Sequence, residues 1–143
     1  MTGYELSITR YIKAPRELVF DAWTQVDHLK KWWGPGKVYC PEAHIDLKVG
    51  GEYRIANQMP DGGMIWISGS FEEIKRPEKL VYNWHVGDND TSPSLVTILF
   101  NERDGGTELE VHHRRIAEEE LRNMHHKGWT GCLDKIEALF KSG

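Results

Sequence analysis

Seven histidines are the side chains of this chain best suited to acid–base or metal chemistry. His112 and His113 are neighbours on an expected strand and point to opposite faces, whereas His125 and His126 lie about 100° apart on an expected helix. Neither pair can chelate a metal side by side. The expected helices also hold no His-x-x-x-His or Glu-x-x-His pair, the spacing that helix-borne metal sites use. We therefore expect no metal site.

Two of these histidines continue apolar faces. His113 follows Leu109 and Val111 at strand alternation, and His125 lies within the apolar stripe of the last expected helix. One interpretation is that each is a neutral, hydrogen-bonded core histidine. The other is that they contact a ligand or move protons beside a pocket.

Gly128 interrupts the apolar stripe of the same helix, at a cost of about 1 kcal/mol relative to Ala. Either the helix packs closely there against an aromatic side chain of a sheet, or a bound ligand approaches it. Both interpretations place Trp129 and the facing strands near the same point.

Several aromatic residues fall on strand faces together with other apolar residues, which is typical of a core or of a pocket wall. These are Tyr53, Phe71, Tyr82, Trp84 and Phe100.

Other aromatic residues are candidates for the rim of an entrance. Trp66 is out of step with Ile65 and Ile67, and Trp32 and Trp33 adjoin a Gly-Pro-Gly turn. Arg54 is out of step with its strand neighbours as well. It either sits outside the sheet or supplies a fixed charge for a carboxylate or phenolate.

No nucleophile is marked by a local motif, because the chain has no Gly-x-Ser-x-Gly elbow, no glycine-rich phosphate loop and no cysteine with a catalytic signature. We assign no catalytic residue and expect no cofactor. The net charge of -4 argues against nucleic acid as a partner. Cys40 and Cys132 have no disulfide or zinc-knuckle spacing, which fits a reducing cytoplasm, and no apolar run is long enough for stable membrane association.

The N-terminal part is expected to form one strand and two short helices. Tyr4–Ile12 alternates as a strand, and Pro15 suits the first turn of a helix. A second helical run then places Leu29, Trp32 and Trp33 on adjoining faces.

About six strands are expected next, without intervening helices, which favours an antiparallel meander. The turn signals that delimit them are Gly50-Gly51, Asp61-Gly62-Gly63, Arg76-Pro77-Glu78, Gly87–Pro93 and Asp104-Gly105-Gly106. The clearest helical periodicity of the chain follows, over Glu118–Phe140. The order predicts a single α+β domain over residues 1–143, with a curved antiparallel sheet of six or seven strands around a long C-terminal helix. This is the helix-grip arrangement.

Seven blocks spread over nearly the whole chain form a specific combination, although each block alone is weak. They are Ile12–Trp23, Trp32–Pro35, Val49–Arg54, Asp61–Gly62, Gly69–Trp84, Gly106–Leu109 and Gly128–Ile136. In this order they resemble the family named activator of heat-shock-protein-90 ATPase homologues. That family is similar to START lipid-binding domains, birch-pollen-type allergens and polyketide cyclases, the SRPBCC superfamily. The resemblance implies a START-like fold with a cavity between sheet and last helix.

We consider three functions. The first is binding of a small lipophilic molecule, aromatic or polyketide-like, that enters near Trp32 and Trp33 and lies against the last helix. The second is a cyclase or aromatase in which His113 or His125 moves protons. The third is a stress-response role on a heat-shock-protein-90 type ATPase. The eukaryotic co-chaperone resembles this chain only in its C-terminal domain and carries a separate N-terminal domain, so we expect any such docking to use the sheet or loops.

We expect the protein to be a monomer or a weak homodimer. The candidate ligand-binding residues are Trp32, Trp33, Tyr53, Arg54, Trp66, Tyr82, Trp84, His113, His125, Gly128 and Trp129.

Overall fold

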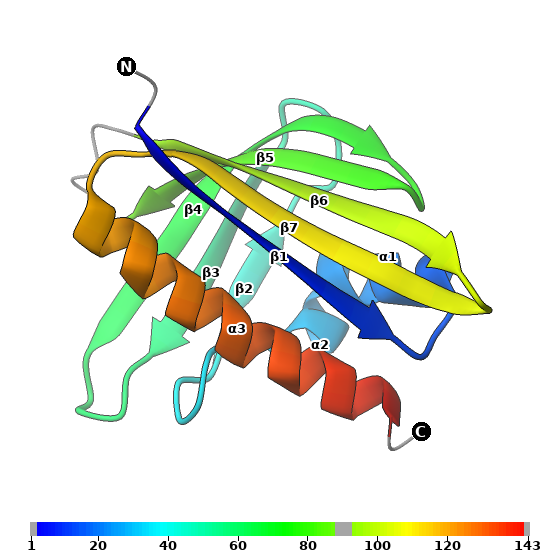
Figure 1. The fold of residues 1–143 in the computed structure, drawn as a ribbon. Helices are drawn as coiled ribbons and strands as arrows, with labels where there is room; N and C mark the ends of the chain where they lie inside the picture. Colours follow the sequence, from blue (N-terminus) through cyan, green and yellow to red (C-terminus); the bar gives the residue numbers. More distant parts are fainter. Residues whose placement is uncertain (1–2, 88–92, 142–143) are drawn as a thin grey trace.

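The computed structural model describes residues 3–87 and 93–141 and shows a curved sheet with a long helix across it (Figure 1). Its elements are β1 (Tyr4–Ile12), α1 (Arg16–Thr24), α2 (Val26–Leu29), β2 (Ala43–Ile45), β3 (Glu52–Gln58), β4 (Met64–Lys75), β5 (Lys79–Val86), β6 (Ser94–Arg103), β7 (Gly106–Ile116) and α3 (Glu119–Lys141). The predicted first strand and long C-terminal helix are confirmed, the latter to within one residue at each end.

The seven strands form one antiparallel sheet in the order β1-β7-β6-β5-β4-β3-β2. Strands β2 to β7 therefore follow one another as the predicted meander, and β1 joins the sheet beside β7. The predicted turns fall between strands, except that Gly106 of the last one already begins β7. Of the expected Gly87–Pro93 turn, residues 88–92 lie outside the described part of the chain.

One face of the sheet forms the core. Every second residue is buried over Leu80–Trp84 of β5 and Ser94–Phe100 of β6, as a sheet with one covered face requires. Phe20 of α1 packs on Phe100 of β6, with ring centroids 5.2 Å apart, and Trp23 of α1 stacks on Trp129 of α3 at 5.9 Å. Both helices therefore cover the same face.

The second helix is shorter than the helical run that the sequence suggests. It ends at Leu29, and Trp32 and Trp33 follow it in a turn in which both backbone N–H groups donate to the Leu29 carbonyl, at 3.2 and 3.0 Å. Gly34 then takes a φ of +100°, which is unfavourable for residues with a Cβ.

The helix α3 lies on the sheet through a buried stripe at helical spacing, made of Trp129, Cys132, Leu133 and Ile136. At the β1 edge of the sheet, Arg10 pairs with Asp134 of α3 at 2.7 Å and with Glu137 of α3 at 3.0 Å. Among the described residues, no helix has the length and apolar character needed to cross a membrane.

Gly131 of α3 packs against the turn after α2. A Cβ built on Gly131 would lie 2.5 Å from the Pro35 side chain, whereas a Cβ built on Gly128, three residues earlier, meets no atom within 4 Å. The two glycines of one helix are therefore in opposite surroundings.

We predict that Gly131→Ala lowers the free energy of unfolding by about 1 kcal/mol, because overpacking outweighs the gain in helix propensity. Gly128→Ala should raise it by up to about 1 kcal/mol, because only the propensity changes. Urea unfolding of both variants measures this difference. Equal effects at the two positions would contradict the packing described for α3.

Candidate functional site

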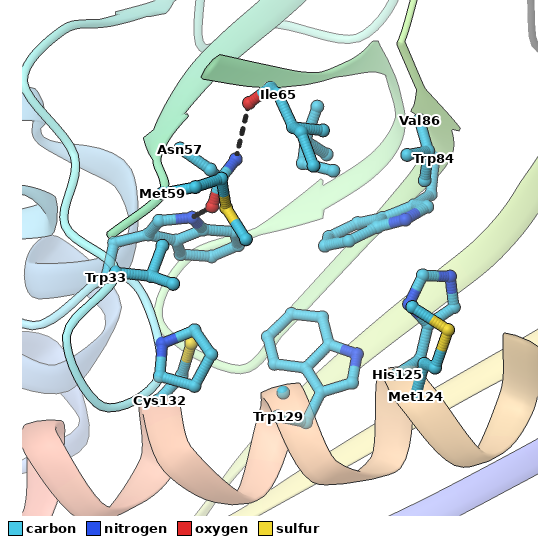
Figure 2. A pocket seen from close by; sticks show the side chains of 14 residues that line it. Trp33, Asn57, Met59, Ile65, Trp84, Val86, Met124, His125, Trp129 and Cys132 are labelled. Atoms are coloured by element: carbon cyan, nitrogen blue, oxygen red, sulfur yellow. Dashed lines mark hydrogen bonds between the residues drawn. The ribbon is translucent and has the colours of Figure 1, made fainter. Parts of the chain in front are cut away.

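A pocket of about 190 Å³ opens between the inner face of the sheet and α3 (Figure 2). Its walls come from β3, β4, β5, the turn after α2, and α3. The lining residues are Trp33, Pro35, Val38, Asn57, Met59, Ile65, Ile67, Trp84, Val86, Met124, His125, Gly128, Trp129 and Cys132. The lining is therefore almost entirely apolar and aromatic.

Gly128 faces this pocket. Because a Cβ built there meets no atom within 4 Å, close packing against a sheet aromatic does not explain the glycine. Among the two interpretations of Gly128 drawn from the sequence, the structure thus supports open space beside the helix. The glycine keeps this part of the pocket unfilled.

Three tryptophans in mutual contact form one part of the wall. Trp129 lies 5.7 Å from Trp33 and 5.3 Å from Trp84, measured between ring centroids, and Trp33 lies 6.1 Å from Trp84. The Trp33 indole N–H donates to Asn57 Oδ1 at 2.8 Å, and Asn57 Nδ2 donates to the Ile65 carbonyl at 3.1 Å, as Figure 2 shows. The Asn57 amide therefore holds the wall in place.

The open side of the pocket lies between the sheet and the N-terminal half of α3. Ile65 on β4 and Met124 on α3 line the pocket and remain 39% and 64% exposed. Exposed apolar side chains at a pocket mouth offer a ligand a path from solvent.

His113 is fully buried on β7, and its two ring nitrogens are both occupied. The Trp129 indole N–H donates to Nδ1 at 3.1 Å, and Nε2 lies 2.6 Å from Ser94 Oγ. Because an indole only donates, Nδ1 accepts, so the proton of the neutral ring sits on Nε2 and is donated to Ser94. Burial, and secondly the neighbouring His125, lower the pKa of His113 to about 3. His113 is therefore a neutral core histidine whose acceptor nitrogen is already used.

His125 is placed differently. Its ring stacks on that of His113, with centroids 4.8 Å apart and an interplanar angle of 11°, and meets the Trp84 ring edge-on at 5.7 Å. Unlike His113, it lines the pocket. Of the two histidines singled out from the sequence, His125 alone reaches the space where a ligand would lie.

Tyr53 and Tyr82 lie deeper, around a second cavity of only about 20 Å³. The Tyr53 hydroxyl donates to the Asn83 carbonyl at 2.7 Å, and the Tyr82 hydroxyl accepts a hydrogen bond from the Trp23 indole at 3.2 Å. Burial raises the pKa of both phenols, so both stay neutral.

Trp32, Trp66 and Arg54 do not line the pocket. Trp32 is fully buried beneath α1, where its indole N–H donates to the Ala22 carbonyl at 2.9 Å, so it cannot rim an entrance. Trp33 lines the pocket but is only 3% exposed, so it is a wall residue and not the rim residue that the sequence suggested. Trp66 and Arg54 lie on the outer face of the sheet, with the guanidinium carbon 4.3 Å from the Trp66 ring centroid. Their alternation places them opposite the core, which corrects the expectation of Trp66 at the rim and favours the outside position for Arg54.

Several lining residues were not identified from the sequence, although the sequence pattern indicates the position of some of them. Met124 and Cys132 lie four residues before and after Gly128, on the same helical stripe. Ile67 follows strand alternation. The positions of Asn57 and Met59 depend on how β3 and β4 turn toward α3, which no local pattern encodes. The lining residues missed are Pro35, Val38, Asn57, Met59, Ile65, Ile67, Val86, Met124 and Cys132.

An antiparallel sheet curved around a long C-terminal helix, with an apolar pocket between them, defines the helix-grip class. A family model described as activator of Hsp90 ATPase homolog 1-like protein matches residues 13–141, and the chain belongs to this family. The SRPBCC group to which the family belongs commonly binds hydrophobic ligands. No functionally curated protein matches the chain.

Solved structures agree with this fold. A protein from Chromobacterium violaceum is similar with a TM-score of 0.88 and 23% identity, over 95% of this chain and 96% of that chain. The AHSA1 protein from Silicibacter pomeroyi is similar with a TM-score of 0.83 and 25% identity, over 94% and 96%. A protein from Nitrosomonas europaea has a TM-score of 0.83 and 23% identity, over 96% and 94%.

The buried neutral His113 predicts a pH-dependent stability. Its folded pKa of about 3 lies below the unfolded value of 6.5, so the unfolded chain binds the extra proton between these values. Stability contributed by the neutral ring is therefore present at pH 7 and lost as the pH falls below about 6.5. At about 1.4 kcal/mol per pH unit, the loss from pH 7 to pH 5 is about 2 kcal/mol.

Urea unfolding at both pH values, for the wild type and for His113→Gln, isolates this contribution. The variant is less stable at pH 7 but should lose about 2 kcal/mol less between pH 7 and pH 5. An equal pH dependence in both proteins would show that His113 is not held neutral.

Proposed function

We propose that this protein binds a small lipophilic molecule, aromatic or polyketide-like, in the pocket between the sheet and α3. The observation that carries the proposal is the empty space beside Gly128, within a pocket whose other walls are aromatic and aliphatic. A protein interior is normally packed about as densely as an organic crystal. An apolar space kept open by a glycine is therefore better explained by a ligand than by folding.

The size of the pocket suggests the size of the ligand. Apolar cavities of roughly 150 Å³ hold benzene, and pockets for drug-sized ligands start at roughly 300 Å³. The pocket of about 190 Å³ therefore suits one ring or a compact pair of rings, with any further part passing between Ile65 and Met124. Burial of apolar area, at about 25 cal/mol per Å², would supply most of the affinity.

For a cyclase or aromatase mechanism, the geometry of the histidines leaves His125 as the candidate base. A cyclase or aromatase mechanism through His113 would need its Nδ1 to accept a proton from the ligand, and that nitrogen already accepts the Trp129 indole N–H. Proton transfer would depend on His125. Docking on a heat-shock-protein-90 type ATPase stays a separate prediction, tested by that enzyme's rate at saturating protein.

A titration with indole and with naphthalene, followed by NMR, tests the binding proposal. We expect saturable shifts of the Trp33 and Trp129 indole N–H signals and of the Gly128 amide. The Trp66 indole on the outer face is the internal control and should not shift.

Gly128→Leu should fill the space and weaken binding about tenfold or more, without loss of stability. Lys127→Leu, which adds the same side chain on the exposed side of α3, is the matched control and should bind like the wild type. The proposal fails if no probe shifts these signals saturably, or if Gly128→Leu binds as tightly as Lys127→Leu.

A further inference from the structure

We propose that Trp33 limits how long an alkyl chain can be buried in the interior, because its indole separates the pocket from the deeper cavity. This inference rests on the proposed function. Trp33 is the residue that lines both spaces, and it is 3% exposed. The deeper cavity is bounded by Trp23, Leu29, Trp33, Ile45, Tyr53, Ile55, Phe71 and Tyr82.

The face of the sheet beneath Trp33 runs from the pocket to the deeper cavity without interruption. Ile67 lines the pocket, and Ile55, directly opposite it across the β3–β4 pair, lines the deeper cavity. Trp84 and Tyr82, two residues apart on β5, are divided between the two spaces in the same way. Neighbouring side chains of one sheet face therefore run from one space to the other.

The partition is the indole itself rather than the backbone that carries it. The next residue, Gly34, is fixed by its φ of +100° and by its N–H, which donates to Cys132 Sγ at 3.3 Å. The indole makes one hydrogen bond, to Asn57, and ring contacts to Trp32, Trp84 and Trp129. A smaller side chain at position 33 would therefore remove the wall and leave the turn in place.

The deeper cavity suits an apolar chain. Its lining is aromatic and aliphatic, and the two phenols in it are neutral with their hydroxyls already engaged. With Trp33 in place this space holds about 20 Å³, too little for a ring. Removing the indole would free the volume that the ring occupies and would join the two spaces into one longer cavity.

A chain-length series tests the inference with para-ethylphenol, para-butylphenol and para-octylphenol as probes, measured by calorimetry. The wild type should bind para-ethylphenol and gain little affinity with longer chains. Trp33→Leu should bind para-octylphenol about tenfold or more tightly than the wild type does, since two further buried methylenes suffice for that factor. Trp33→Phe should give a smaller shift in the same direction and provides a conservative variant if Trp33→Leu does not fold.

Trp32→Phe is the matched control, because Trp32 lines neither space, and it should keep the wild-type preference. If the Trp33 variants bind para-ethylphenol but keep the wild-type preference for chain length, Trp33 does not limit the length of the buried chain, and the proposed function stands. If neither the wild type nor the variants bind any probe, the proposed function fails and this inference with it.

Discussion

The rest of the interior depends on the hydrogen bond between Trp129 of α3 and His113 of β7. This single residue of α3 donates a buried hydrogen bond to His113 of β7, stacks on Trp23 of α1 and contacts Trp33 and Trp84. The hydrogen bond fixes where α3 meets the sheet, because a buried indole N–H without an acceptor is costly. Once α3 is held there, the neighbouring Gly128 cannot approach the sheet, and the pocket beside it stays open.

An open apolar space is costly for a protein of this size. Side chains around it lose packing contacts, and each unfilled volume lowers stability. The two glycines of α3 show that the helix is not loosely packed in general, since Gly131 touches Pro35 closely while Gly128 faces the space. The looseness is local, as the proposed ligand pocket requires.

Much of the architecture could be predicted from the sequence, because it rests on local patterns. The alternation of apolar and polar residues predicted β1, turn residues predicted the ends of the strands, and helical periodicity predicted α3. Alternation also indicated that Trp66 and Arg54 are out of step with the core-facing residues around them. Trp32 could not be placed in this way, because it follows a helix of four residues, where neither period applies.

The interior of the site was less predictable, because many of its contacts join residues far apart in the sequence. Gly128, Trp129 and His125 stand out on one helical stripe, so that part of the pocket could be anticipated. The tautomer of His113 depends on an indole sixteen residues further along the chain, and the wall at Trp33 depends on Asn57. Such pairings are set by tertiary packing, and no local spacing encodes them.

Diffraction from crystals pressurised with xenon would show whether the pocket beside Gly128 is open and apolar, since xenon occupies apolar cavities that water leaves empty. We expect a xenon atom between Gly128, Trp33 and Trp129 in the wild type, and its loss in Gly128→Leu. A chain of ordered water molecules in the pocket, or side chains closing it, would show that no apolar space is held open there.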